Sequence, residues 1–110
     1  MTLTKQQEGA NLTVAVEGRL DTVTAPQLEE ALKTSLDGVT RLTLDFSRLV
    51  YVSSAGLRVI LMAVKELRSR KGRAVLCALT PYVKEVFDVS QFSAVVPIAD
   101  SVETGLQLVR

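Results

Sequence analysis

Residues 42–57 read LTLDFSRLVYVSSAGL, and this stretch decides how the chain is organised. Its first part has the apolar pattern of a β-strand, and that pattern continues through residues 49–52. A turn of small residues follows at positions 53–56, and a long helical pattern starts there. The sequence therefore predicts a strand that leads directly into a helix. Two adjacent hydroxyls, those of Ser53 and Ser54, are expected at the helix N-terminus, where they face solvent.

The N-terminal part of the chain predicts a β-hairpin followed by a helix. Residues 3–8 are polar and weakly patterned, as in an edge strand, whereas residues 12–18 alternate between apolar and polar side chains. Gly9 to Asn11 form the predicted turn between them. A helix start is indicated by Thr24 as the N-cap, Pro26 in the first turn and Gln27 three positions after the cap, and Asp37-Gly38 closes this helix.

The helix that begins near Ser54 is the longest one predicted, and it ends by about Lys71-Gly72. Its expected core face carries apolar side chains three and four residues apart: Leu57, Ile60, Leu61, Val64 and Leu67. At about 100° per residue, Val59 and Met62 are predicted on the opposite face, beside Arg58 and Glu66. Two apolar side chains on an outer face close to the hydroxyl pair indicate a contact patch.

The C-terminal part of the chain predicts two further strands, each followed by a helix. Residues 73–79 form a nearly continuous apolar strand, as expected where helices cover both faces of a sheet. Thr80-Pro81 caps and begins a helix with Val83, Val86 and Phe87 inward. Residues 95–98 form a short strand, and its proline favours an edge or terminal position. A capping box at residues 100–103 opens the final helix, which runs through Leu106 and Val109.

The order of these elements predicts the fold class. Strands that alternate with helices imply right-handed crossovers and a mostly parallel sheet. We expect an α/β fold in which a small mixed sheet of about five strands is flanked by about four helices. A chain of 110 residues is large enough for one hydrophobic core, so residues 1–110 are predicted to form a single domain.

Composition narrows the range of functions. Apolar residues make up 47% of the chain, and the 13 basic and 12 acidic residues leave a net charge of only +1. This balance gives no electrostatic reason to expect nucleic acid or an anionic membrane as the main partner. No signal segment is visible at the N-terminus and no apolar run approaches a membrane span, so a cytoplasmic location is predicted.

The chemistry available to side chains is also restricted. Histidine is absent, which excludes Ser-His-Asp and Cys-His catalysis, histidine-ligated zinc and histidine as a phosphocarrier. The one cysteine, Cys77, lies in an apolar strand pattern and is interpreted as a small buried hydrophobe. We therefore expect no catalytic residues, no metal site and no cofactor.

Three interpretations of Ser53 and Ser54 remain open from the local residues. The simplest is helix capping, in which one serine accepts backbone N–H bonds. Nucleotide binding is disfavoured, because no glycine-rich phosphate loop follows any strand. A phosphoacceptor is the third, since a helix N-terminus tolerates the charge of a phosphate, and phosphorylation there changes the surface without disturbing the fold.

Four motifs in this order and spacing resemble the STAS-domain anti-sigma factor antagonists (anti-anti-sigma factors) of bacteria. They cover nearly the full chain and are Gly18-Arg19-Leu20-Asp21, Leu44-Asp45-Phe46-Ser47, Tyr51-Val52-Ser53-Ser54-Ala55-Gly56-Leu57-Arg58 and Leu79-Thr80-Pro81-Tyr82-Val83-Lys84-Glu85-Val86-Phe87. The fold of that family, a small sheet flanked by helices, agrees with the order of elements predicted above.

The resemblance implies a site and a mechanism. In the family's turn, the phosphoacceptor serine comes directly after an aspartate. The phosphoacceptor position falls on Ser54 here, and the aspartate position falls on Ser53, which is the alternative acceptor. The implied contact surface for a partner comprises Asp21, Thr22, Asp45, Ser53, Ser54, Gly56, Arg58, Val59 and Met62.

The mechanism implied is partner switching in the control of transcription. The unphosphorylated chain would bind an anti-sigma factor serine kinase with a histidine-kinase-like ATPase fold, and so release a sigma factor. Phosphorylation would abolish binding, and a PP2C-type phosphatase would restore it. Two alternatives remain: a non-switching STAS subunit of a lipid-transport or stress-sensing assembly, and a nucleotide-binding STAS module.

Overall fold

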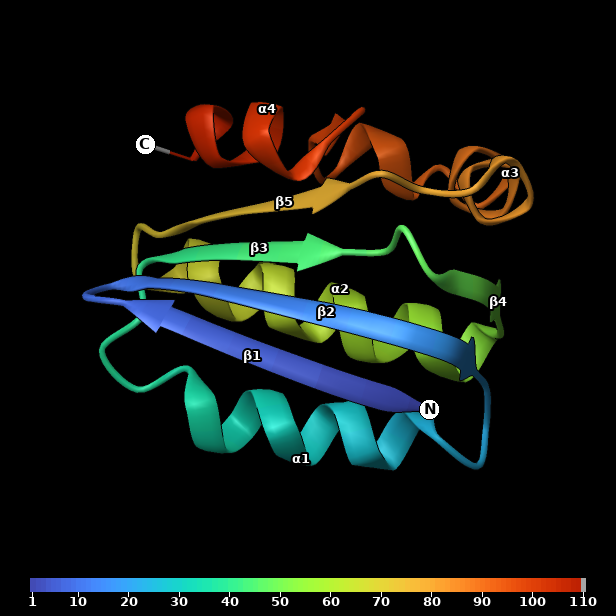
Figure 1. Ribbon diagram of the computed structural model, residues 1–110, viewed down its shortest axis with the longest axis horizontal. Helices are drawn as coiled ribbons and strands as arrows, with labels where there is room; N and C mark the ends of the chain where they lie inside the picture. Colours follow the sequence, from blue (N-terminus) through green and yellow to red (C-terminus); the bar gives the residue numbers. More distant parts are fainter. Residues whose placement is uncertain (110) are drawn as a thin grey trace.

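The computed structural model describes residues 1–109, which form one mixed sheet with helices on both of its faces (Figure 1). The elements follow one another in the order β1 (Thr2–Glu8), β2 (Asn11–Leu20), α1 (Ala25–Ser35), β3 (Arg41–Asp45), β4 (Leu49–Val52), α2 (Ser54–Ser69), β5 (Arg73–Cys77), α3 (Pro81–Val89), a 3₁₀ turn (Phe92–Ala94), β6 (Ile98–Ala99) and α4 (Val102–Leu108). The predicted α/β class, the hairpin and the four helices are confirmed.

The sheet runs in the order β1-β2-β3-β5-β6, and only the β1–β2 hairpin is antiparallel. Six strands are present in the described chain rather than about five, because the stretch predicted as one strand pattern folds as β3 and β4. The two pair with successive halves of β2: Asp45 of β3 lies opposite Ala15, and Val52 of β4 lies opposite Leu20. Strand β2 is long enough to hold both.

A tight turn separates β3 from β4. The carboxylate of Asp45 accepts a hydrogen bond from the backbone N–H of Ser47 (3.0 Å), and the N–H of Leu49 donates to the carbonyl oxygen of Phe46 (3.0 Å). An aspartate that bonds to the backbone two residues later is a common turn-forming arrangement. This turn moves the chain to the far half of β2 before α2 begins.

Helices α1 and α2 cover one face of the sheet, and α4 covers part of the other. Leu76 of β5 belongs to the main core on the α2 side, whereas its neighbours Val75 and Cys77 pack with Ala99 and Val109 in a second cluster under α4. Adjacent strand residues point to opposite faces, so β5 is buried on both of them, as its continuous apolar sequence predicts. The short strand β6 lies at Ile98–Ala99 rather than at the predicted residues 95–98; it pairs with β5 and forms the predicted edge.

The prediction that Val59 lies on the outer face of α2 is wrong. Val59 is buried, with 6% of its surface exposed, whereas Met62 is 38% exposed and Arg58 is exposed as expected. The buried residues of α2 also include Ala63 and Leu67, which follow Val59 at intervals of four. Because α2 packs against α1 as well as against the sheet, its buried face is wider than a single apolar stripe.

Two of the predicted helix caps work differently from expectation. The side chains of Thr24 and Thr80 do not cap α1 and α3; the Thr80 hydroxyl instead donates to the carbonyl oxygen of Leu49. Ser101 does cap α4 by accepting the N–H of Thr104.

Strand β4, helix α3 and the N-terminal end of α2 lie together at one end of the molecule, on the right of Figure 1.

Candidate functional site

Ser53 is the N-cap of α2. Its backbone is extended (φ −97°, ψ 174°), and its side-chain oxygen accepts the N–H of Gly56 at 3.4 Å. Its own N–H donates to the carbonyl oxygen of Leu20 at 2.9 Å, which continues the pairing of β4 with β2. Ser53 is therefore held on both sides, by the strand before it and by the helix after it.

Ser54 is the first residue of α2 and is exposed. Its hydroxyl makes no hydrogen bond to any residue within the described range 1–109. It lies where unpaired backbone N–H groups and the helix dipole favour negative charge. Of the two adjacent serines, Ser53 has a structural role in the cap, whereas the Ser54 hydroxyl is free for other chemistry.

Gly56 is buried because α2 starts very close to the end of β2. A Cβ atom at this position would lie 2.7 Å from Cγ of Leu20 and 3.0 Å from its carbonyl oxygen. Both distances are shorter than an ordinary van der Waals contact, so only glycine fits without a shift of backbone. Gly56 thus fixes the position of the Ser53–Ser54 pair relative to the sheet and offers no exposed side chain to a partner.

Asp21 is half-buried and holds the turn between β2 and α1. Its Oδ1 accepts the backbone N–H groups of Val23 and Thr24, both at 3.0 Å, and the Thr24 hydroxyl lies 3.2 Å away. The hydrogen bond from the Thr24 N–H is the main cause that lowers the pKa of Asp21, and Arg19 adds a small attraction. Asp21 is thus a carboxylate that organises the loop, and Thr22 lies exposed at the tip of that loop.

Asp45 does not lie with the other predicted site residues. It is opposite Ala15 on β2, whereas Ser53 bonds to Leu20, five residues further along that strand. At ~3.3 Å per residue this corresponds to roughly 17 Å. The structure therefore brings Asp21, Thr22, Ser53 and Ser54 together at the end of β2 and β4 and leaves Asp45 at the end of β3, opposite the middle of β2.

A stack of side chains beside Ser53 is absent from the predicted site residues. Arg19 of β2 lies with its guanidinium carbon 4.2 Å from the ring centre of Tyr51 of β4. The Tyr51 ring in turn stacks on Tyr82 of α3, with 6.2 Å between ring centres and 15° between ring planes. All three lie in the quoted motifs, but no periodicity along the chain signals that strand β2, strand β4 and helix α3 meet there.

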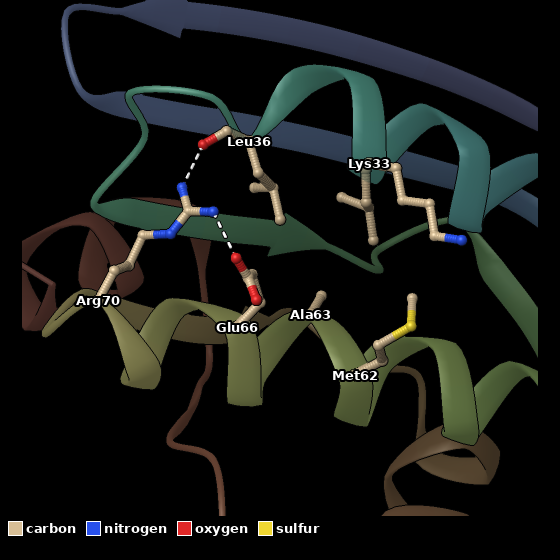
Figure 2. Close-up of a pocket in the computed structure, with 7 residues that line it drawn as sticks. Lys33, Leu36, Met62, Ala63, Glu66 and Arg70 are labelled. Carbon is tan, nitrogen blue, oxygen red and sulfur yellow. Dashed lines mark hydrogen bonds and ion pairs between the residues drawn. The ribbon is translucent and has the colours of Figure 1, made fainter.

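A small groove lies between α1 and α2. It has a volume of about 190 Å³ and is lined by Leu32, Lys33, Leu36, Met62, Ala63, Glu66 and Arg70. Figure 2 shows Arg70 reaching from α2 to Glu66 and to the carbonyl oxygen of Leu36 at the end of α1. The bond to Leu36 fastens the C-terminal ends of the two helices together, away from Ser54, whereas the bond to Glu66 stays within the last turn of α2.

Residues 1–109 contain no cluster of three histidine, cysteine, aspartate or glutamate side chains that could hold a metal ion. No helix in the described part of the chain has both the length and the apolar character needed to cross a membrane.

The family model of the STAS domain matches residues 2–105. The chain belongs to the STAS domain family. The junction at Ser53 and Ser54, the turn held by Asp21 and the aromatic stack all lie inside the matched part of the STAS domain.

Several relatives of this STAS domain are named as anti-sigma factor antagonists. It is 43% identical over 106 residues to the "Putative anti-sigma factor antagonist BtrV" of Bordetella bronchiseptica. The aligned region covers 96% of this chain and 91% of that protein. A crystal structure of an anti-sigma factor antagonist from Mycobacterium paratuberculosis is 24% identical, with a TM-score of 0.89 over 99% of this chain and 93% of that one.

The fold is also that of SpoIIAA, described as a Bacillus cell fate determinant and solved in its phosphorylated form. It is 23% identical to this chain, with a TM-score of 0.76 over 99% of this chain and all of that one. The family assignment confirms the predicted resemblance, and the relatives support a function as an anti-sigma factor antagonist, a class that is regulatory rather than catalytic.

Proposed function

We propose that this STAS domain is an anti-sigma factor antagonist that works by partner switching, with Ser54 as the phosphoacceptor. In the unphosphorylated state it binds an anti-sigma factor serine kinase, phosphorylation of Ser54 ends that binding, and a PP2C-type phosphatase restores it. The observation that carries the proposal is the free, exposed hydroxyl of Ser54 at the first residue of α2. The proposal is also supported by SpoIIAA, a protein of the same fold whose structure was solved in a phosphorylated form.

The physical basis of the switch is a change of charge at a surface that stays folded. A phosphate on Ser54 adds roughly −1.5 to −2 charges at pH 7, and the N-terminus of α2 tolerates them. A partner packed against Ser54 would have to desolvate this dianion. Only about 1–3 kcal/mol of lost binding free energy is needed for a 5- to 150-fold weaker complex.

Ser54 is preferred to Ser53 because the two hydroxyls differ in availability. The Ser53 oxygen already accepts a hydrogen bond from Gly56 and is only partly exposed. A kinase must reach its acceptor and leave the helix intact, and Ser54 meets both conditions. The proposed contact surface comprises Asp21, Thr22, Ser53, Ser54, Arg58 and Met62, with Val59 and Gly56 beneath it and Asp45 outside it.

Residues 1–110 act as a single domain that is not an enzyme in its own right and needs no cofactor, since ATP and metal belong to the kinase. The switch operates in the cytoplasm, where the sigma factor and its regulators meet.

The decisive experiment incubates the chain with ATP and an ATPase-type serine kinase of the anti-sigma factor class from the same organism. Mass spectrometry should find one phosphate on Ser54 in the wild-type chain and none in Ser54→Ala. Ser53→Ala is the matched control and should still be phosphorylated. Phosphate on Ser53 instead would move the acceptor by one residue, and none on either serine would favour a non-switching STAS subunit of a larger assembly.

A further inference from the structure

The Arg19–Tyr51–Tyr82 stack is exposed although it is well ordered by its own contacts. The Arg19 side chain is 61% exposed and Tyr82 is 50% exposed, and Tyr51 is partly covered between them. Cation–π and ring–ring contacts hold the three side chains in register. Aromatic and arginine side chains of this kind dominate the binding energy of protein interfaces.

The guanidinium of Arg19 keeps hydrogen-bonding capacity for a partner. Its only acidic neighbour in the described chain is Asp21, whose Oδ2 lies 4.0 Å from the Arg19 Nε, too far for a good hydrogen bond. The Oδ1 of Asp21 is already engaged by the turn before α1. Arg19 is therefore held by the Tyr51 ring while its N–H groups remain available to donate hydrogen bonds to a planar carboxylate from outside.

The stack is continuous with the proposed switch. Tyr51 precedes Ser53 by two residues, and Ser53 is still extended, so the two side chains leave the backbone on the same side. Val52 between them is buried in the core. A partner that covers the Ser53–Ser54 pair just after β4 therefore meets the stack within the same contact.

Preorganisation makes this cluster a favourable anchor. Binding normally costs about 0.5–1.5 kcal/mol for each flexible side chain that becomes immobilised. The Tyr51 ring, with Arg19 on it and Tyr82 stacked against it, has lost most of that freedom before any partner arrives. Tyrosine also presents a large contact area at a low entropic cost, because only two side-chain torsions need to be fixed.

We infer that the Arg19–Tyr51–Tyr82 stack anchors the anti-sigma factor, with a partner carboxylate on Arg19 and an apolar or aromatic partner side chain over Tyr82. This inference rests on the proposed function and adds to it the residues that determine affinity. The stack thereby extends the contact surface from the end of α2 across β4 to the start of α3.

Binding measurements with the anti-sigma factor serine kinase test the anchor directly. Arg19→Ala and Tyr82→Ala should each weaken binding of the unphosphorylated chain by about tenfold or more. Tyr82→Phe keeps the ring and should bind within about twofold of wild type, and Arg19→Lys should be intermediate because it keeps charge but not the planar fork. Val89→Ala is the matched control: it removes another exposed apolar side chain, 78% exposed, two turns further along α3.

A second measurement reports on the same residues in the chain with both tyrosines kept. The chain contains two tyrosines and no tryptophan, and both tyrosines are in the stack. Fluorine NMR of the chain labelled with 3-fluorotyrosine should therefore give two resonances, assigned with Tyr82→Phe, and both should shift when the kinase is added. Circular dichroism should show that every variant remains folded.

The outcomes separate this inference from the proposed function. If the wild-type chain binds the kinase while Arg19→Ala and Tyr82→Ala bind equally well, the anchor is wrong and the proposed function stands. If the wild-type chain does not bind, the proposed function is overturned, and the anchor with it. Fluorine shifts that depend on the concentration of this chain alone would assign the stack to a contact between two copies and overturn the proposed partner.

Discussion

At the scale of single residues, two neighbouring serines with the same side chain have different roles, and the backbone decides which is which. Ser53 is extended and caps α2, whereas Ser54 is helical and exposed. The sequence places both at the helix start but does not tell which hydroxyl is used by the cap. That assignment depends on the dihedral angles at one residue, which the pairing of Ser53 with Leu20 sets.

This difference predicts different effects on stability. Ser53→Ala removes the cap and should lower the free energy of unfolding by about 0.5–1 kcal/mol, the low end for an N-cap because its bond to Gly56 is long. Ser54→Ala should change it by less than about 0.5 kcal/mol, as is usual for exposed sites. Urea unfolding followed by circular dichroism measures both, and a larger loss for Ser54→Ala would contradict the assignment of the cap.

At the scale of elements, the sequence predicts the helices and the hairpin well because their signals are local. Alternation, helical spacing and turn residues lie within a few positions of one another. The division of residues 42–52 into β3 and β4 is not local in this sense, because it depends on β2 being long enough to pair with both. The burial of Val59 likewise depends on the packing of α2 against α1, which periodicity along one helix cannot show.

The packing of α4 on β5 gives a prediction at this scale. A Cβ on Gly105 would lie 2.1 Å from the sulfur of Cys77 and 3.3 Å from Cγ1 of Val75. Gly105→Ala should therefore add a packing cost of about 1–3 kcal/mol, from which the ~1 kcal/mol that alanine gains over glycine in a helix is subtracted, so the chain should be destabilised by up to about 2 kcal/mol. Burial raises the pKa of the Cys77 thiol to about 11, so a neutral thiol occupies this contact at pH 7.

A double-mutant cycle isolates that contact. In a Cys77→Ala background the sulfur is gone, so Gly105→Ala should cost much less than it does in the wild-type chain. Urea unfolding of the wild type, the two single variants and the double variant gives the coupling free energy. An equal cost in both backgrounds would show that α4 is not positioned by its contact with Cys77.

At the scale of the whole molecule, the candidate site is a place where separate segments meet, and this limits its prediction from sequence. The serine pair could be recognised because its residues are consecutive. The Arg19–Tyr51–Tyr82 stack could not, because its members come from β2, β4 and α3 and have no spacing rule in common. Asp45 shows the opposite error: it lies close to Ser54 in sequence, yet the change from β3 to β4 carries the two apart.

The proposed switch requires that charge at Ser54 alters binding without damage to the fold. Ser54→Asp places a carboxylate at the first residue of α2, where the helix dipole favours negative charge by about 0.3–1 kcal/mol. The thermal midpoint of Ser54→Asp should therefore equal or exceed that of the wild-type chain. Its affinity for the kinase should be at least about fivefold lower than that of the unphosphorylated wild-type chain.

Ser54→Asn is the matched control for this charge, because it has nearly the same shape as aspartate and is neutral. It should bind far more tightly than Ser54→Asp if charge is the cause of the loss. Thermal unfolding by circular dichroism and calorimetric titration with the kinase should be done on the same preparations. A fall in both the midpoint and the affinity would attribute the lost binding to a damaged α2, since a switch that acts through charge must leave stability and binding independent of each other.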